Sequence, residues 1–343
     1  MKKISVIIPC FNVEKYIDRC LSSVFSQSFP IDEVQVICVD DGSLDDTFQK
    51  LSLWEKDHPY ITIIGLDSNK GQSTARNIAL SYADGEFVAF IDADDWIDQN
   101  YLKAMYDIAV SGQYDIVQCD FVRDSENSTI NPTPSVTSHT DGISILIDSK
   151  ETRKKIITTK TISSNAPMKL IKRSLLTNNA INFNDGLRYE DIAFGLLLTM
   201  YAKNVFLLKD KLYHYCINGT STVLKKNETY HTDLIANWDI LWTDLHDRNL
   251  FESYKDEFEL EFVYSCVVIF WKILAFRFDD PPYSLYVLLA QKVKRYIPNI
   301  MENPYIRNNR LSELHMLLLN CCMQDLDESA FRQVIGNIRK IGL

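Results

Sequence analysis

The chain has 343 residues, of which 46% are hydrophobic and 24% charged, so it can bury a large core and has room for two or three structural units. Its formal net charge of -10 argues against nucleic acid as a partner and does not favour adsorption to an anionic bilayer. The eight cysteines form no CxxC pair and several lie inside apolar patterns, which predicts reduced thiols in a cytoplasmic protein.

The first hundred residues alternate between short apolar runs and amphipathic segments. Strands are predicted at 4–8, 34–39, 61–66 and 87–91, with helices at 13–24, before Pro59 and at 73–83. The run 4–8 is too short for the core of a signal peptide, so we expect it to be the first strand. Asn12 is expected to cap the first helix. This order predicts an α/β fold with a mostly parallel, doubly wound sheet that binds ligands at the carboxyl ends of its strands.

The later residues contain a polar stretch and then a helical pattern. Residues 123–141 are rich in Ser, Thr, Asn and Pro, which predicts a lid or a long hairpin. Beyond 227 the apolar residues recur at helical spacing, so an α-helical C-terminal domain is expected. Its most apolar segment, 262–271, has about half the length needed to cross a bilayer. Its aromatic patches leave three alternatives open, namely core, a homodimer contact and a dock for a lipid-linked acceptor.

Acidic residues follow two of the predicted strands. The sequence Asp-Asp-Gly-Ser occupies 40–43, and Asp-Ala-Asp-Asp occupies 92–95. Crowded carboxylates repel one another unless a cation lies between them, and their hard oxygens suit Mg²⁺ or Mn²⁺ shared with substrate phosphates. The alternative is an acidic turn that caps the next helix. No GxGxxG follows the first strand and no GxxxxGK is present, which disfavours a dinucleotide-binding domain and a P-loop.

Four motifs in this order resemble the successive signatures of the family 2 glycosyltransferases with the GT-A fold. They occupy 6–12, 39–43, 71–77 and 90–95. The segments 168–173 and 183–194 resemble the acceptor-side half of family members that build bacterial capsules and lipopolysaccharides. The resemblance covers about residues 1–224. It implies a nucleotide-sugar-binding half at 1–100 and an acceptor-binding half at 101–226, followed by the helical domain at 227–343.

The resemblance also implies a reaction and its partners. It implies inverting transfer of a sugar from a nucleotide diphosphate to a hydroxyl of a saccharide or lipid-linked saccharide in cell-surface polysaccharide synthesis, with Mn²⁺ or Mg²⁺ as cofactor. UDP is the first candidate nucleotide because a carboxylate at Asp41 can accept the imide N–H of uracil, although guanine and thymine also offer N–H donors. A cytoplasmic enzyme, with or without peripheral contact at the inner face of the membrane, would fit this role.

Carried over by position, the resemblance names the residues of a donor site. Asp41 is expected to hold the nucleobase and Arg76 to lie near the base and ribose; the full set is Pro9, Phe11, Asn12, Asp41, Gly71, Arg76, Asp92 and Ala93. The alternatives are a tight-turn aspartate and a cation on a helix surface.

The metal set implied by the resemblance is Asp92, Asp94, Asp95 and His214. Asp94 is expected to be the direct ligand and Asp95 to support it. His214 would add a further contact to the metal or to phosphate, with a structural histidine as the alternative. Lys169 is a candidate for the phosphates, and a surface lysine is the alternative. The loop 218–222, which contains Ser221, is a candidate to close over the diphosphate with its backbone N–H groups.

Inverting transfer needs a base that takes the proton from the acceptor hydroxyl. Asp191 is the candidate, with Glu190 beside it, because the pair opens an apolar helical run and the family pattern places the base at the second acid. Capping of that helix by the same acids is the alternative.

Three rival classes share parts of this pattern. A DxD phosphatase would carry its motif on the first strand, with Thr or Val where this chain has Trp96. A sugar nucleotidyltransferase would carry a loop rich in glycine and arginine after the first strand, which is absent. A non-catalytic nucleotide-sugar-binding protein would keep Asp41 and Asp94 and lose the base, so the acids at 190–191 argue against that class.

Overall fold

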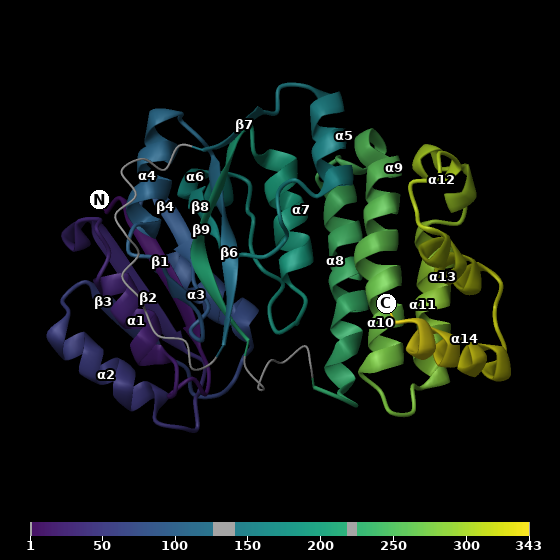
Figure 1. Cartoon of the computed structure of the whole chain (residues 1–343), viewed down its shortest axis with the longest axis horizontal. Helices are drawn as coiled ribbons and strands as arrows, with labels where there is room; N and C mark the ends of the chain where they lie inside the picture. The colour runs from purple at the N-terminus through teal and green to yellow at the C-terminus, as the bar shows by residue number, and fades with distance from the viewer. Residues whose placement is uncertain (1, 126–140, 218–224, 343) are drawn as a thin grey trace. The chain divides into compact units, whose positions relative to one another are not determined.

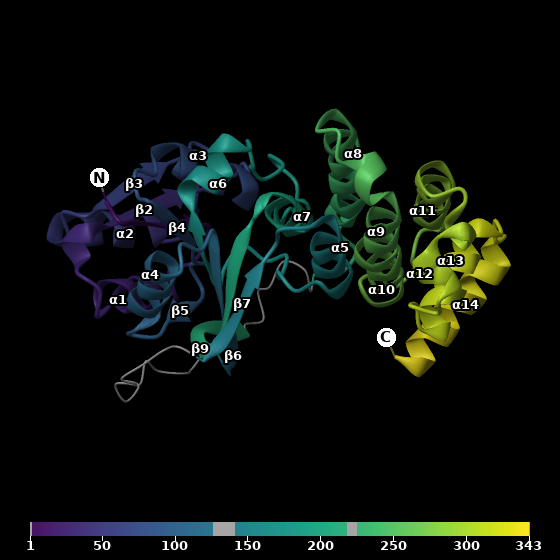
Figure 2. The same cartoon turned by 90° about the horizontal axis from the view of Figure 1, so that it is seen from above.

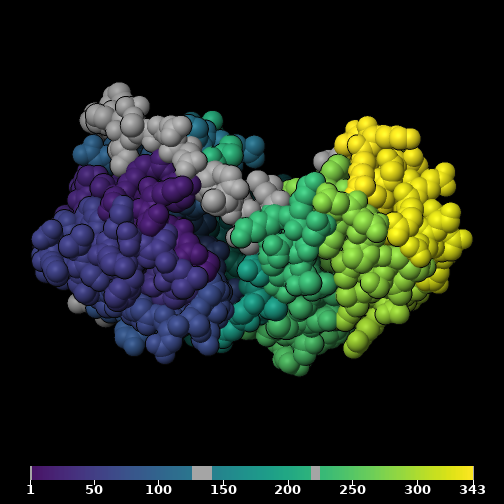
Figure 3. Space-filling view, turned by 90° about the horizontal axis from the view of Figure 1, so that it is seen from below, coloured from purple at the N-terminus to yellow at the C-terminus, as the bar shows by residue number. Residues whose placement is uncertain are grey.

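The computed structural model describes residues 2–125, 141–217 and 225–342, and most of the predicted lid or hairpin at 123–141 lies outside these ranges (Figure 1). The chain divides into two compact units. Unit 1 comprises Met1–Arg153, Ile162–Gly186 and Ala193–Gly219, and unit 2 comprises Lys154–Thr161, Leu187–Ile192 and Thr220–Leu343. Figure 3 shows the surface of the N-terminal residues in purple and blue and that of the C-terminal residues in green and yellow.

The described part of unit 1 contains one nine-stranded sheet with the order β3-β2-β1-β4-β8-β6-β9-β5, in which β7 also pairs with β9. The first four strands of this order are parallel, as predicted, and β8 continues the sheet antiparallel to β4. Beyond β8 the pairing is mixed. The strands are β1 (Ile4–Cys10), β2 (Val34–Asp40), β3 (Ile61–Gly65), β4 (Phe87–Phe90), β5 (Trp96–Ile97), β6 (Ile116–Ser125), β7 (Gly142–Leu146), β8 (Lys169–Lys172) and β9 (Asn204–Ile217).

The central strands are buried and largely apolar because helices cover both faces of the sheet. All seven residues of β1 are buried, as expected for a parallel strand between two helical layers. Alternate residues Ile4, Val6 and Ile8 join a core with residues of α1, α2 and α4. Figure 2 shows α3 and α6 on one face and α1 and α4 on the other. The helices are α1 (Ile17–Phe25), α2 (Thr47–Asp57), α3 (Gln72–Tyr82), α4 (Tyr101–Ser111) and α6 (Arg173–Asn178).

One expectation for the first helix is wrong. Asn12 does not cap α1, whose N-cap residue is Tyr16. Asn12 has a positive φ of 52°, its side-chain oxygen accepts from the N–H of Leu44 at 2.8 Å, and its own N–H donates to Ser43 Oγ at 3.0 Å. Asn12 therefore links the loop after β1 to the loop after β2, which is a contact between distant residues that helical spacing does not reveal.

Unit 2 is helical, as predicted, and its described core is rich in aromatic rings. Trp271 packs with Tyr286 and Phe331, and Trp238 and Trp242 contact Phe262. None of the helices in the described ranges is long and apolar enough to cross a membrane. The larger elements are α8 (Asp233–Asp247), α9 (Phe251–Phe262), the π-helix η4 (Val263–Val268), α10 (Ile269–Phe276), α11 (Tyr283–Tyr296), α13 (Glu313–Met323) and α14 (Glu328–Ile341), with η3 (Thr229–Thr232) before α8 and α12 (Pro304–Arg307) before α13.

Two helices have residues in both units, namely α5 (Lys150–Thr159) and α7 (Asp191–Tyr201). The division into 1–100, 101–226 and 227–343 stays a prediction.

Candidate active site

The N-terminus of α3 lies against the loop that follows β2. Asp41 is buried, and its two carboxylate oxygens accept from the backbone N–H groups of Lys70 and Gly71 at 2.6 and 2.8 Å. Burial raises the pKa of Asp41, and the two backbone hydrogen bonds oppose that rise. Gly71 has a φ of +93°, which only glycine adopts readily. Asp41 therefore holds the start of α3, and its remaining lone pairs are what it can offer a ligand.

The neighbouring Asp40 is a residue that the sequence interpretation passed over. It is also buried; Oδ2 accepts from the N–H of Ser43 at 3.2 Å, while Oδ1 has no hydrogen-bond partner among the described residues. A buried carboxylate oxygen without a partner is costly, so such an atom in this loop marks a place where a ligand N–H would be favourable.

The loop after β1 supplies the apolar part of the same region. Pro9 is buried in β1 opposite Val39 of β2, and the next loop residues include Phe11, whose side chain is 40% exposed. The N–H of Asp41 donates to the carbonyl of Cys10 at 2.8 Å. An exposed aromatic ring close in sequence to this contact is suited to cover one face of a planar base.

Asp92, which is partly exposed, is bound to α3 through an ion pair with a buried arginine. Its Oδ1 accepts from Arg76 at 2.8 Å and from Gln72 Nε2 at 2.9 Å. The Arg76 side chain is 2% exposed, and its guanidinium lies over the ring of Phe183 at 5.1 Å. Arg76 is thus a buried cation paired with the acidic loop, which rules out the alternative of a cation on a helix surface, and its place near the base and ribose stays a prediction. Because α3 contacts both Asp41 and Asp92, it joins the two acidic motifs.

Asp95 anchors the 92–95 turn to β9. It is 1% exposed; Oδ2 accepts from the hydroxyl of Tyr213 at 2.6 Å and Oδ1 from the N–H of Cys216 at 2.7 Å. Burial, followed by the charges of Asp92 and Asp94, raises the pKa of Asp95 well above its ordinary value. The Tyr213 hydroxyl also accepts from the N–H of Asp92 at 3.2 Å. Tyr213 on β9 therefore fixes both ends of the 92–95 turn, a role that no pattern in the sequence indicates.

His214 is the next residue of β9 and pairs with Trp96 of β5. Its ring stacks on Trp96 at a centroid distance of 5.0 Å, and its Nδ1 lies 2.6 Å from Oδ2 of Asp124. Trp96 also contacts Arg19, whose guanidinium lies 4.0 Å from the Trp96 ring centroid and donates to the carbonyl of Asp94 at 3.1 Å. Within the described ranges only Nδ1 of the His214 ring has a hydrogen-bond partner, so Nε2 is the nitrogen that could bind a ligand.

The described residues offer donor atoms that suit a hard cation but no gathered metal site. In the described ranges, no group of three or more His, Cys, Asp and Glu side chains is close enough to hold a metal ion. Asp92 Oδ1 is already paired with Arg76 and both oxygens of Asp95 are hydrogen-bonded, whereas Asp94 is half-exposed. Carboxylate oxygens of Asp94 and Asp92 are the donors that fit Mn²⁺ or Mg²⁺.

Glu190 and Asp191 belong to unit 2, whereas the donor-site candidates belong to unit 1. Glu190 is buried and Asp191, half-exposed, is the first residue of α7. Their assignment as base and neighbour stays a prediction.

Two further candidates from the sequence concern the phosphates, namely Lys169 and the loop 218–222. Lys169 is fully buried, and its Nζ donates to Ser163 Oγ at 2.8 Å and to the carbonyl of Asn165, so it is not the surface lysine of the alternative interpretation. The loop 218–222, a candidate phosphate contact, lies outside the described residues.

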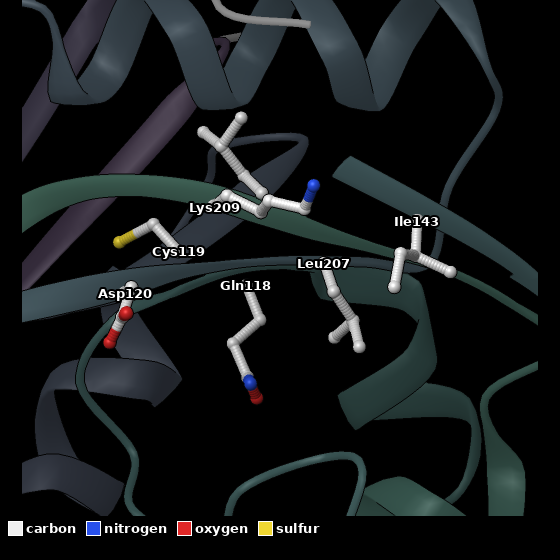
Figure 4. A pocket seen from close by; sticks show the side chains of 7 residues that line it. Gln118, Cys119, Asp120, Ile143, Leu207 and Lys209 are labelled. Atoms are coloured by element: carbon white, nitrogen blue, oxygen red, sulfur yellow. The ribbon is translucent and has the colours of Figure 1, made fainter. Parts of the chain in front are cut away.

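A hollow of about 380 Å³ lies elsewhere on the sheet, between β6, β7 and β9 (Figure 4). Figure 4 shows Gln118, Asp120, Leu207 and Lys209 along its sides. Gln118 and Asp120 belong to β6, and Leu207 and Lys209 to the first half of β9, whereas the acidic cluster contacts the end of β9 at 213–216. The hollow is therefore not part of the candidate site.

Comparison with known proteins identifies the family. The sequence model described as glycosyl transferase family 2 matches residues 5–178, just over half of the chain. This chain belongs to glycosyl transferase family 2. The matched residues include the acidic loops after β2 and β4, α3 and β8, so the family expected from the four motifs is confirmed.

The curated relatives of this family 2 chain include longer proteins. It is 29% identical over 270 residues to the poly(ribitol-phosphate) beta-N-acetylglucosaminyltransferase TarS of Staphylococcus aureus (strain Mu50), covering 77% of this chain and 44% of TarS. It is 30% identical over 219 residues to a poly(ribitol-phosphate) beta-glucosyltransferase of Bacillus spizizenii (strain W23), covering 63% and 32%. The chain thus spans less than half of these two relatives. It is 27% identical over 276 residues to EpsH of Bacillus subtilis (strain 168), covering 78% and 77%.

A solved structure shares the fold. The crystal structure of S. aureus TarS 1-349 in complex with UDP-GlcNAc matches with a TM-score of 0.67 at 24% identity, covering 99% of this chain and 90% of that one. At this identity the likeness concerns the fold alone. It confirms the expected GT-A fold with a helical C-terminal region.

Proposed function

We propose that this chain is an inverting glycosyltransferase that moves a sugar from a nucleotide diphosphate, with UDP first among the nucleotides, to a hydroxyl of a saccharide or lipid-linked saccharide in cell-surface polysaccharide synthesis. The observation that carries this proposal is the double contact made at α3: its N-cap residue Gly71 donates to Asp41, and its buried Arg76 pairs with Asp92. Two acidic strand ends joined by a helix N-terminus suit a ligand with a polar base at one end and a diphosphate at the other.

In this proposal the nucleotide binds at the carboxyl ends of β1, β2 and β4. Phe11 covers the base, and the carboxylates of Asp40 and Asp41 accept its N–H. Arg76 offsets part of the acidic charge that would otherwise repel a diphosphate. UDP-GlcNAc, the ligand in the TarS structure, is the first donor to test.

Asp191 is proposed as the base. It takes the proton of the acceptor hydroxyl while that oxygen forms a bond to the anomeric carbon and the bond from that carbon to the diphosphate oxygen breaks, which inverts the configuration. Gly186, five residues before Asp191, belongs to the loop whose residue Phe183 exchanges two hydrogen bonds with Asn77 of α3. Five residues span at most about 18 Å, so chain connectivity keeps Asp191 within that distance of Gly186.

A divalent metal, when bound by Asp94 and Asp92, would supply positive charge for the departing diphosphate.

A nucleotide-sugar screen tests the proposal directly. Binding of a ligand to the folded state raises the unfolding temperature, so UDP and UDP-sugars should stabilise the protein more than ADP-sugars do. The protein is then incubated with the donor that stabilises it most and with poly(ribitol phosphate) or water as acceptor, and the release of UDP is measured. Binding without any release of UDP would identify a non-catalytic nucleotide-sugar-binding protein, and no stabilisation by any donor would refute the proposal.

A further inference from the structure

The segment that leads into the proposed base has an unusual backbone. Tyr189 has a φ of +64°, in the left-handed region that residues with a β-carbon seldom adopt. Its carbonyl accepts from the N–H of Ile192 at 3.4 Å, so Glu190 and Asp191 form the turn between these two groups. A left-handed residue of this kind is strained and persists only when its surroundings hold it.

The first helical residues of unit 2 after 225 hold this segment. The hydroxyl of Tyr189 lies 2.7 Å from Nδ1 of His231, which is fully buried. On the residue before it, the N–H of Arg188 donates to Asp233 Oδ2 at 3.1 Å and the carbonyl accepts from Asn237 Nδ2 at 2.5 Å. The backbone N–H and carbonyl of Arg188 and the side chain of Tyr189 are thus all bound to residues of η3 and α8.

The direction of the Tyr189–His231 hydrogen bond follows from the other ring nitrogen. His231 Nε2 lies 3.1 Å from the carbonyl of Lys225, which can only accept, so Nε2 carries the hydrogen. Burial lowers the pKa of His231, which favours the neutral ring and leaves Nδ1 as an acceptor. Burial raises the pKa of Tyr189 to about 12, so its hydroxyl keeps its hydrogen and donates to His231.

We propose that Tyr189 and His231 are positioning residues, which hold the backbone of the 188–191 segment so that Asp191 is aimed for proton abstraction. This inference rests on the proposed function, because it assigns a role through Asp191. It also gives η3 and α8 a role in turnover, without contact to the nucleotide. A displacement of about 1 Å in a reacting group can lower the rate on the order of 100-fold. Loss of the Tyr189–His231 hydrogen bond can therefore lower turnover if it shifts Asp191 by a similar distance.

The main test compares two tyrosine-to-phenylalanine variants in the same unit. Tyr189→Phe removes the hydrogen bond to His231. Tyr283→Phe removes a partly buried hydrogen bond of 2.6 Å from the Tyr283 hydroxyl to the carbonyl of Leu326, and it serves as the matched control. We expect Tyr189→Phe to lower kcat for UDP release from the donor found in the screen by about 10- to 100-fold, with UDP affinity within about twofold of wild type. Tyr283→Phe should keep wild-type turnover.

Replacement of His231 provides a rescue experiment. Glutamine can accept from Tyr189 and donate to the carbonyl of Lys225, whereas leucine can do neither. His231→Gln should therefore retain more turnover than His231→Leu. Hydrogen–deuterium exchange of a peptide covering 187–192 gives a readout that needs no activity: exchange should rise in Tyr189→Phe and His231→Leu and stay unchanged in Tyr283→Phe.

The outcomes separate this inference from the proposed function. In an Asp191→Asn background, Tyr189→Phe should cause no further loss of turnover, because both changes act through the same group. If Asp191→Asn is inactive while Tyr189→Phe matches Tyr283→Phe in turnover and in exchange, the positioning role is refuted and the base assignment stands. If Asp191→Asn retains turnover, the base assignment fails, and the role through Asp191 fails with it.

Discussion

Among single residues, Asp94 is the carboxylate of the 92–95 turn that carries the metal hypothesis. Asp94→Asn should weaken UDP binding in the presence of Mn²⁺ by at least about tenfold, roughly 1.4 kcal/mol, because the amide is a poorer ligand for a cation that offsets the diphosphate charge. Titration of UDP with Mn²⁺ and with a chelator measures this.

Asp57→Asn is the control for that titration, since Asp57 is exposed at the end of α2. Equal UDP affinity in wild type and Asp94→Asn, with and without the chelator, would exclude a metal role for Asp94.

His231 makes a second prediction at the residue scale. Burial lowers the pKa of His231 below its ordinary 6.5, so as the pH falls the unfolded chain binds this proton before the folded chain does. The free energy of unfolding therefore decreases as the pH drops through about 6.5, until the folded state is protonated as well. Thermal unfolding between pH 7.5 and 5.5 should show a smaller loss in His231→Gln than in wild type. An unchanged slope in the variant would contradict this.

Single residues also show where sequence reasoning stopped. The acids at 41, 92, 94 and 95 are visible because they follow apolar strands, and Asp92 is bound to Arg76 in the structure. The role of Tyr213 cannot be inferred from such a pattern. A tyrosine within a strand is ordinarily a packing residue, and its partner Asp95 lies 118 positions away. Hydrogen bonds between such distant residues depend on the tertiary fold, which no local spacing encodes.

At the scale of elements, apolar runs in the sequence located the strands well. Helices that carry many charged residues were harder to locate from the sequence. The strands at 4–10, 34–40, 61–65 and 87–90 agree with the predicted runs to within two residues at each end. Within the region beyond 227 that is predicted to be helical, α9 has no clear apolar pattern of its own, because Glu257 and Glu259 interrupt it. Both are buried, and their partners Tyr305 and Asn303 come from the segment at the start of α12.

A pair of helical glycines tests the packing of α7. A β-carbon at Gly195 would lie 2.4 Å from Cα of Ser164, whereas one at Gly336 in α14 would meet nothing within 4 Å. Alanine is the better helix former by about 1 kcal/mol. Gly336→Ala should therefore raise the unfolding temperature, while Gly195→Ala should lower it, because overpacking against backbone costs about 1–3 kcal/mol or more.

Thermal unfolding of both purified variants measures the difference. A Gly195→Ala protein as stable as Gly336→Ala would mean that α7 does not pack against the 163–165 loop as described.

For the whole molecule, composition set limits that the fold respects. All eight cysteines are free and buried, in agreement with the expectation of reduced core thiols. The net charge of -10 leaves the chain with no bulk attraction for an anionic donor. Affinity for a nucleotide diphosphate must then come from local groups such as Arg76, from backbone N–H groups or from a metal. The donor site should accordingly be sensitive to single substitutions.

The central claim is sugar transfer with Asp191 as the base, and its most direct test is to measure UDP binding and UDP-sugar turnover side by side in Asp191→Asn and Glu190→Gln. Asp191→Asn nearly preserves the shape of the side chain and removes its capacity to accept a proton. UDP affinity should stay close to wild type while transfer falls by a factor on the order of 10² to 10⁴, and Glu190→Gln should be milder. Near-wild-type transfer by Asp191→Asn with an inactive Glu190→Gln would reverse the assignment, and full activity of both variants would contradict it.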